Sequence, residues 1–246
     1  MTHTYTRTRT EPLRIFIGYD SKEPVAYHVL SHSILRHASV PVTIMPLVQS
    51  VLRDAGLYTR ERKSTESTEF SITRFLVPYL AGYRGQALFM DCDMLCQGDV
   101  AELFEMAHYS NRPYPSPRMG VHVVQHEYQT TQEVKFLGQV NLPYPRKNWS
   151  SVMMFDCERC SQLTPERVNI LSGLELHRFS WLKDEELGTL PVTWNWLVGE
   201  YEANPYAKLL HYTLGGPWFE PTRYCDQADL WKNEWERMST PGAVLV

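Results

Sequence analysis

The chain has 246 residues and a mass of 28.6 kDa, which is enough to bury one large hydrophobic core or two small ones. With 43% hydrophobic and 12% aromatic residues, the composition excludes an intrinsically disordered protein. The formal net charge of -4 lacks the basic excess of nucleic-acid-binding proteins, so we expect no nucleic-acid partner. A bound divalent cation would still permit phosphate-bearing ligands.

The N-terminal segment MTHTYTRTRTEP has no apolar stretch, which predicts a disordered tail over residues 1–12. No segment approaches the roughly 18–20 apolar residues that span a bilayer, so we expect a cytoplasmic protein without a transmembrane segment. Trp231 and Trp235 near the C-terminus are compatible with packing or with peripheral contact at a membrane surface. Because neither a repeat nor a domain boundary is visible, residues 13–246 are expected to form one domain.

The first regular elements follow a strand–helix–strand pattern. Residues 13–18 form a short apolar run that predicts a strand, and Pro24 opens a helical pattern to about residue 37. Residues 42–47 predict a second strand. This order favours an α/β protein with a doubly wound, mostly parallel sheet.

The rest of the chain predicts further helices and strands around an irregular insertion. A polar stretch at 59–69 precedes a helix over 71–80 and a strand that ends with the apolar run 87–90. Asp99 is a suitable N-cap for a helix over 99–105. Residues 111–147 are rich in Pro, Tyr and Gly and are expected to shape a pocket. The remaining predicted elements are strands at 121–124 and 152–155 and an amphipathic helix near 165–174.

Five cysteines raise the alternative of a structural zinc site. Cys157 and Cys160 form a CxxC pair, and Cys92 and Cys96 form a second pair with three residues between them. Since no glycine-rich knuckle surrounds either pair, we expect reduced, buried thiols instead.

An apolar strand that ends in Asp91-Cys92-Asp93 suggests metal binding. Residues two apart in a strand point to the same side, roughly 6.6 Å apart, so both carboxylates face one region while Cys92 faces away. At the C-terminal end of a parallel strand, that region is where ligands bind in open α/β sheets. Two carboxylates suit Mg²⁺ or Mn²⁺ bound together with substrate phosphates. The alternative is an exposed turn at the end of a strand.

Four segments in order carry a resemblance to a known family. The chain resembles GT-A type nucleotide-sugar glycosyltransferases and is most similar to glycosyltransferase family 8. The segments are IFIGYD at 15–20, SITRFLVP at 71–78, LFMDCD at 88–93 and HYTLGGPW at 211–218. The resemblance implies a single GT-A (Rossmann-like) domain, with a mostly parallel central sheet flanked by helices and the Pro/Tyr-rich insertion near the acceptor side.

The resemblance also implies a reaction and its ligands. A sugar would pass from a nucleotide-diphosphate donor, expected to be a UDP-sugar, to a hydroxyl of a saccharide or glycolipid acceptor with retention of configuration. Mn²⁺ or Mg²⁺ would stabilise the departing diphosphate. By the same resemblance the metal ligands are Asp91, Asp93 and His211, and Asp91 also contacts the ribose. For His211 alone, a buried core histidine is the alternative reading.

The same resemblance implies further donor contacts. Gly18, Tyr19 and Asp20 would receive the nucleoside, with a simple turn as the alternative. Arg74 would bind phosphate or pair with Asp91, or extend along the surface. The backbone N–H groups of Gly215 and Gly216 would approach the diphosphate.

Two departures from the family pattern stand out. Gly216 replaces the lysine of the C-terminal segment, which is one residue short. Trp149, Ser150 and Ser151 stand where the family usually has Asn-Ala-Gly.

The acidic run at 184–186 has two readings. Charged runs are mostly solvated surface. By the resemblance, Asp184 would bind acceptor or donor hydroxyls and Glu185 would stabilise or attack the anomeric carbon. Three tryptophans are candidates for stacking on sugars, although aromatic residues are more often core: Trp194, Trp196 and Trp218.

Two other classes of function stay open. A sugar-phosphate nucleotidyltransferase would share the sheet and the metal chemistry, but it should carry a glycine-rich, basic loop after the first strand. Here that loop has one Gly and one Lys. A non-catalytic carbohydrate-binding module is the third alternative.

Overall fold

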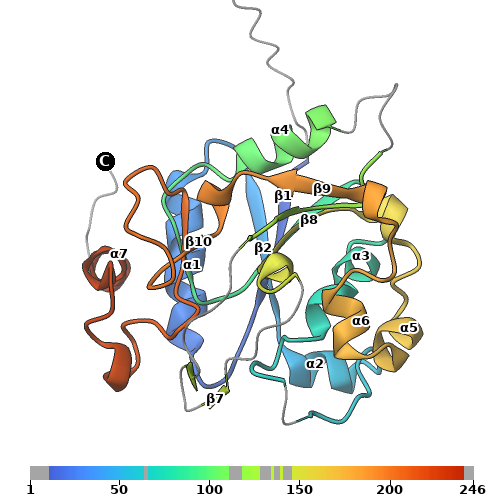
Figure 1. Ribbon diagram of the computed structural model, residues 1–246, viewed down its shortest axis with the longest axis horizontal. Helices are drawn as coiled ribbons and strands as arrows, with labels where there is room; N and C mark the ends of the chain where they lie inside the picture. The colour runs from blue at the N-terminus through green and yellow to red at the C-terminus, as the bar shows by residue number, and fades with distance from the viewer. Residues whose placement is uncertain are drawn as a thin grey trace, which may run out of the picture.

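In the computed structural model, the described residues are 11–63, 66–110, 118–127, 134–135, 139–140 and 146–240. They build an α/β fold around a six-stranded sheet (Figure 1). Its order is β2 (Val42–Leu47), β1 (Leu13–Gly18), β3 (Gln86–Met90), β8 (Val152–Asp156), β5 (Val121–Val124) and β9 (Leu187–Leu190). All neighbours pair in parallel except those of β8, which confirms the predicted mostly parallel sheet.

Two smaller sheets accompany the main one. The first has the order β10 (Trp196–Leu197), β11 (Leu209–His211) and β4 (Met94–Cys96), and the second pairs β6 (Val134–Lys135) with β7 (Gln139–Val140). None of these short strands is among the predicted elements, because two or three residues are too few to show a period. Most of the predicted insertion at 111–147, like residues 1–10 of the predicted tail, lies outside the described residues.

Helices flank the sheet on two sides (Figure 1). The helix α1 matches its predicted bounds, and its buried positions follow helical spacing. The predicted helix 165–174 is divided in two, because Ser172 starts a new helix through a capping box with Glu175. The α-helices are α1 (Pro24–His37), α2 (Gln49–Asp54), α3 (Val77–Leu80), α4 (Ala101–Ser110), α5 (Pro165–Ile170), α6 (Gly173–His177) and α7 (Ala228–Ser239).

Short 3₁₀ helices connect several strands. They are η1 (Thr73–Leu76), η3 (Trp149–Ser151), η4 (Cys157–Cys160), η5 (Asp184–Glu186), η6 (Val192–Trp194) and η7 (Glu220–Thr222). The predicted helix over 71–80 is therefore η1 followed by α3. In the described part of the chain, no helix is both long and apolar enough to cross a bilayer.

The cysteines are core residues. Cys92, Cys96, Cys157 and Cys160 are fully buried, and all five cysteines are free thiols. Burial raises the pKa of Cys96 and of Cys157 to about 12, so these thiols stay protonated. Among the described residues, the group able to hold a metal contains no cysteine, which favours the buried-thiol reading over zinc.

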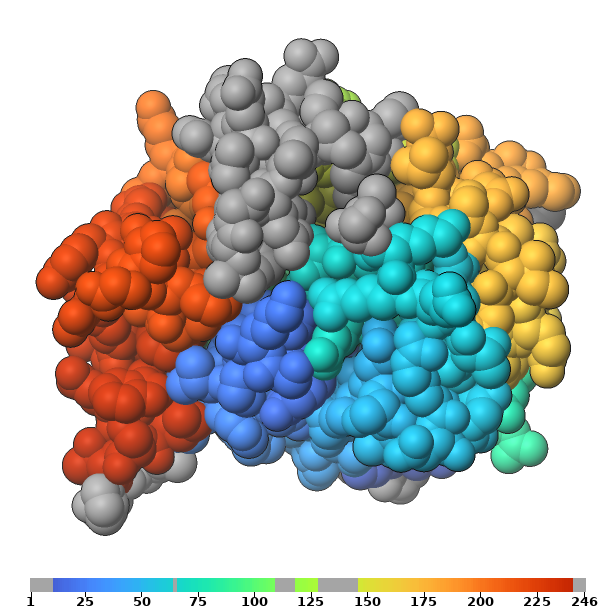
Figure 2. Space-filling view, turned by 90° about the horizontal axis from the view of Figure 1, so that it is seen from below, coloured from blue at the N-terminus to red at the C-terminus, as the bar shows by residue number. Residues whose placement is uncertain are grey.

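A buried carboxylate joins the C-terminal helix to α1. Glu234 of α7 is 3% exposed. Its carboxylate accepts hydrogen bonds from Arg36, the shortest at 2.8 Å, and lies 2.7 Å from His32 Nδ1. Figure 2 shows the red C-terminal segment against the blue N-terminal segment. Burial alone would raise the pKa of Glu234, but the hydrogen bonds from Arg36 and His32 outweigh it and hold that pKa below its ordinary value of 4.5.

Glu234→Ala is expected to lower the free energy of unfolding by about 3 kcal/mol. This value is the lower end of the range for breaking a buried ion pair, because Arg36 is 30% exposed and stays hydrated. Since the folded-state pKa is depressed, this stabilisation is present above the unfolded pKa and is lost as pH falls through the folded pKa. In chemical denaturation, the difference in unfolding free energy between the wild type and Glu234→Ala should therefore be smaller near pH 3 than at pH 7. Glu236→Ala, at an exposed position on the same helix, is the control, and equal stability of the two variants at pH 7 would contradict the prediction.

Candidate active site

The three residues predicted as metal ligands lie together. Asp91, Asp93 and His211 each offer one ligand atom, and these atoms lie within 4.8 Å of one another. Asp91 directly follows β3, and His211 ends β11, where it pairs with Met94 of β4. The backbone N–H of Tyr212 also donates to the carbonyl of Asp93 at 2.9 Å. Main-chain pairing therefore brings two distant segments to one edge of the main sheet, and we call Asp91, Asp93 and His211 the triad.

The chemistry of the triad fits a divalent cation. Asp93 Oδ1 is buried and lies 3.3 Å from His211 Nε2, yet no described group hydrogen-bonds it. A buried carboxylate oxygen without such a partner is costly unless a cation or water completes its shell. Two carboxylates and an imidazole suit Mn²⁺ or Mg²⁺.

Asn195 fixes the orientation of the His211 ring. The amide Nδ2 of Asn195 donates to Ser151 Oγ at 2.8 Å and to the carbonyl of Asn148 at 3.3 Å. Its Oδ1 is therefore left to accept from His211 Nδ1, 2.8 Å away. That hydrogen bond places the proton on Nδ1 and a lone pair on Nε2, which is the atom that faces Asp93. Sequence reasoning missed Asn195, although it lies between two tryptophans that were singled out.

Arg74 is paired with Asp91, one of the two partners predicted for it. The Nη1 atom lies 2.8 Å from Asp91 Oδ1 and donates to the carbonyl of Ser150 at 2.9 Å. The guanidinium also lies 5.3 Å from the centre of the Phe70 ring and 5.0 Å from that of Phe89. Because Arg74 is only 5% exposed, it is a fixed counter-ion of Asp91 and not a surface residue.

A second buried histidine adjoins the triad. His126 follows β5, is 7% exposed, and lies with Nδ1 2.9 Å from the hydroxyl of Tyr201. Burial is the main cause that lowers the pKa of His126, to about 3. The ring is neutral at physiological pH, so it adds no positive charge beside the triad.

Asp20 has a structural role that the sequence did not reveal. It is 2% exposed, and its two carboxylate oxygens accept the backbone N–H groups of Lys22 and Glu69, each at 3.0 Å. Glu69 in turn accepts from the hydroxyl of Ser21 at 2.7 Å. Asp20 therefore joins the loop after β1 to the segment before η1, which leaves less of its carboxylate available to a ribose than expected.

The two residues before Asp20 differ in their surroundings. A Cβ on Gly18 would meet the Phe70 ring at 2.3 Å, so glycine is needed there for close packing. Tyr19 is half-buried and stands edge-to-face with Tyr27.

The expected anion-binding nest of Gly215 and Gly216 stays a prediction, and both glycines also have a structural role. The N–H of Gly215 already donates to the carbonyl of Tyr212 at 2.9 Å. A Cβ on Gly216 would meet the Trp218 ring at 2.0 Å. The first glycine therefore completes a turn, and the second makes room for an indole ring.

The strand register separates the predicted catalytic pair from the triad. Asp184 and Glu185 are exposed and come directly before β9. Leu187 of β9 pairs with Val121 of β5, Val121 pairs with Phe155 of β8, and Phe155 pairs with Ala87 of β3. Leu187 and Ala87 therefore stand at the same height in the sheet. Given about 3.3 Å per residue and 4.8 Å per strand, Leu187 lies roughly 20 Å from Asp91. The strand β9 runs in the same direction as β3, so it begins at the edge of the sheet opposite the triad. Asp184 and Glu185 come before that beginning, and the structure therefore does not bring them to the triad.

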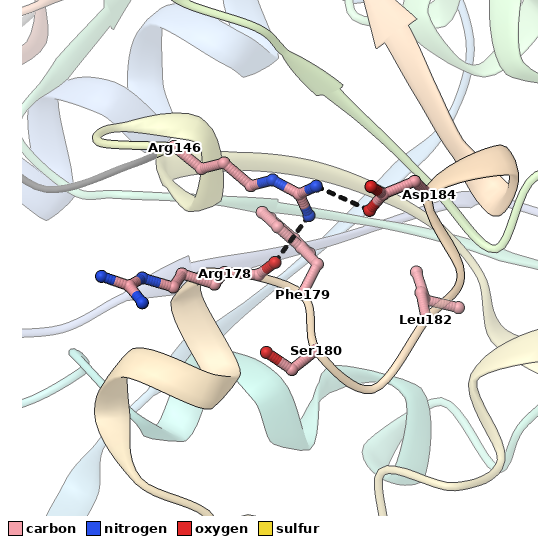
Figure 3. A pocket seen from close by; sticks show the side chains of 6 residues that line it. All are labelled: Arg146, Arg178, Phe179, Ser180, Leu182 and Asp184. Carbon is pink, nitrogen blue, oxygen red and sulfur yellow. Dashed lines mark hydrogen bonds and ion pairs between the residues drawn. The ribbon is translucent and has the colours of Figure 1, made fainter.

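Asp184 instead lines a separate small pocket of about 280 Å³ (Figure 3). Arg146 Nη2 lies 2.6 Å from Asp184 Oδ1, and Nη1 donates to the carbonyl of Arg178. The carboxylate of Asp184 is 81% exposed, so this ion pair contributes little to stability.

Of the three candidate tryptophans, Trp194 belongs to the core. It is fully buried, and Trp196 is half-buried with its Nε1–H donating to the carbonyl of Glu202. Trp218 donates its Nε1–H to the carboxylate of Glu23 at 3.1 Å. These contacts engage both indole N–H groups within the protein.

Comparison with known proteins agrees with this architecture. No protein-family model matches the chain. The glycosyltransferase GlyE of Streptococcus pneumoniae TIGR4 superposes with a TM-score of 0.58 at 15% identity, covering 93% of this chain and 62% of the GlyE chain. This chain thus spans less than two thirds of GlyE. The galactosyltransferase LgtC, solved with donor and acceptor sugar analogues, gives a TM-score of 0.51 at 9% identity, covering 93% of this chain and 97% of LgtC.

At these identities the likeness shows a shared fold, and the chain has the GT-A-like architecture of these glycosyltransferases. A sequence relative is much more similar. Protein CDI of Arabidopsis thaliana is 46% identical over 233 residues, which cover 92% of this chain and 87% of that protein. The chain therefore belongs to the same protein family as Arabidopsis protein CDI.

Proposed function

We propose that the protein is a glycosyltransferase that moves a sugar from a nucleotide-diphosphate donor to a hydroxyl acceptor. One observation carries the proposal: Asp91, Asp93 and His211 meet at the C-terminal edge of β3 in a GT-A-like fold. In open α/β sheets this edge is where ligands bind. The donor class, UDP as its expected nucleotide, the saccharide or glycolipid acceptor, and retention of configuration come from the resemblance to glycosyltransferase family 8.

In this proposal Asp91, Asp93 and His211 hold Mn²⁺ or Mg²⁺, and the cation supplies the positive charge that stabilises the departing diphosphate. The chain's own groups prepare that site. Arg74 offsets the charge of Asp91 and fixes its carboxylate, and Asn195 directs the lone pair of His211 Nε2 toward Asp93. We assign no catalytic role to Asp184 and Glu185 in this proposal, since they precede β9, whose first residue Leu187 lies roughly 20 Å from Asp91 by the strand register.

The decisive experiment is a panel of nucleotide sugars assayed for Mn²⁺-dependent release of nucleoside diphosphate, with isothermal titration of UDP in the presence and absence of Mn²⁺. Metal-dependent binding of a nucleoside diphosphate and turnover of one donor support the proposal. No metal-dependent binding of any nucleoside diphosphate would refute it. Preference for nucleoside triphosphates would indicate a nucleotidyltransferase, and the anomeric signal of the product in NMR tests retention.

Asp93→Asn is expected to abolish metal-dependent turnover while leaving the melting temperature close to that of the wild type. The amide keeps the shape of the side chain but removes the negative charge that a hard cation needs. Turnover is measured at saturating Mn²⁺ and folding by circular dichroism. Asp54→Asn, at an exposed position of α2, is the control. Full activity of the Asp93 variant would show that the carboxylate is not a metal ligand.

Asn195→Ala is expected to weaken Mn²⁺ binding by about 10- to 100-fold, the usual cost of losing a partner of a metal-bound histidine. The His211 ring then loses the acceptor that keeps the proton on Nδ1. Isothermal titration with Mn²⁺ gives the affinity. Asn233→Ala, at an exposed position of α7, should bind as the wild type does. Unchanged affinity in the Asn195 variant would contradict the role of Asn195 in orienting His211 for the ion.

A further inference from the structure

A buried carboxyl group that neither the sequence pattern nor the proposed reaction uses lies beside the triad. Glu23 is 2% exposed. It occupies the N-cap position of α1, where Ser, Thr, Asp or Asn commonly caps a helix, and its side chain makes no capping hydrogen bond. Instead it turns inward. A buried carboxyl group that does not serve its own helix needs another explanation.

The partners of Glu23 come from the two segments that supply the triad. Trp218 Nε1 donates to Oε2 at 3.1 Å, and the thiol of Cys92 donates to Oε1 at 3.6 Å. Cys92 lies between the two aspartates, and Trp218 ends the segment that begins with His211. One carboxyl group thus connects both segments to the start of α1.

Packing around the indole ring of Trp218 fixes it within hydrogen-bonding distance of Glu23. Gly216 leaves the space that the indole ring fills, since any Cβ there would overlap it at 2.0 Å. The ring is held edge-to-face against Tyr212 and also contacts Trp231 of α7, with ring centres 6.0 and 5.1 Å apart. An indole packed in this way is a fixed hydrogen-bond donor to Glu23. Because Glu23 also accepts from Cys92, the position of the indole helps to fix the Asp91–Asp93 turn.

We propose that Glu23 is a positioning residue that holds the Asp91–Asp93 turn and the segment 211–218 in the geometry required for metal binding. This inference rests on the proposed function, because it assumes that the triad binds a divalent cation. Burial, then the charges of Asp93 and Asp20, raise the pKa of Glu23 to about 9.

The test measures Mn²⁺ affinity by isothermal titration, with circular dichroism melting as the control for folding. Glu23→Ala is expected to bind Mn²⁺ at least about tenfold more weakly than the wild type. Glu23→Gln keeps an acceptor for Trp218 and should restore affinity close to the wild-type value. Glu236→Ala, which removes an exposed carboxylate of α7, is the control and should bind Mn²⁺ as the wild type does.

Trp218→Phe provides a second variant in case Glu23→Ala does not fold. It removes the N–H donor, keeps an aromatic ring against Tyr212 and Trp231, and is expected to weaken Mn²⁺ binding in the same direction. Combined with Glu23→Ala it should add little, because the two residues act through one hydrogen bond.

The outcomes separate this inference from the proposed function. A wild-type protein that does not bind Mn²⁺ would overturn the proposed metal site, and this inference with it. If the wild type binds, then unchanged affinity in Glu23→Ala overturns the positioning role alone. Equal losses in Glu23→Ala and Glu23→Gln would also overturn it, since a charge and not a hydrogen-bond acceptor would then be required.

Discussion

The pairing of β4 with β11 brings the triad together, although each strand has only three residues. Such a short pair is not stable by itself in water and needs support from its surroundings. On one side, Ser33 of α1 accepts the N–H of Cys96 through its hydroxyl. On the other side, α7 packs Trp231 against Trp218, and Glu234 ties α7 to α1. The geometry of the triad therefore depends on a C-terminal helix that contributes none of its three residues.

The segment 148–151 connects the side chains that pair with Asp91 and with His211. The carbonyl of Ser150 accepts from Arg74, which pairs with Asp91, and the hydroxyl of Ser151 accepts from Asn195, which orients His211. Asn148 starts this turn with a φ of 62°, a left-handed conformation that asparagine tolerates better than most residues. The glycosyltransferase family 8 pattern, which the sequence resembles, usually has Asn-Ala-Gly here, and the serines that depart from it provide hydrogen bonds inside the protein.

The sequence predicted what local pattern and motif order determine. Apolar periodicity located β1, α1 and β2, and the ordered motifs identified the residues that meet as the triad. It did not predict contacts set by tertiary packing. The run at 184–186 looked catalytic because the chemistry of carboxylates is visible in a sequence, whereas the direction of β9 and its register are not. Glu23 looked like an ordinary acid before a helix, and only the fold shows that it points inward.

Because position 216 is a glycine, it supplies no side-chain cation for the proposed reaction. The glycosyltransferase family 8 pattern, which the sequence resembles, has a lysine in this segment, whose cation would lie near the diphosphate. Here the same position admits the Trp218 ring, and the nearby N–H of Gly215 is already engaged. Arg74 is committed to Asp91 and to the carbonyl of Ser150. Since neither Gly216 nor Arg74 offers a free cation, the charge on the leaving diphosphate in the proposed reaction would depend on a metal bound at the triad.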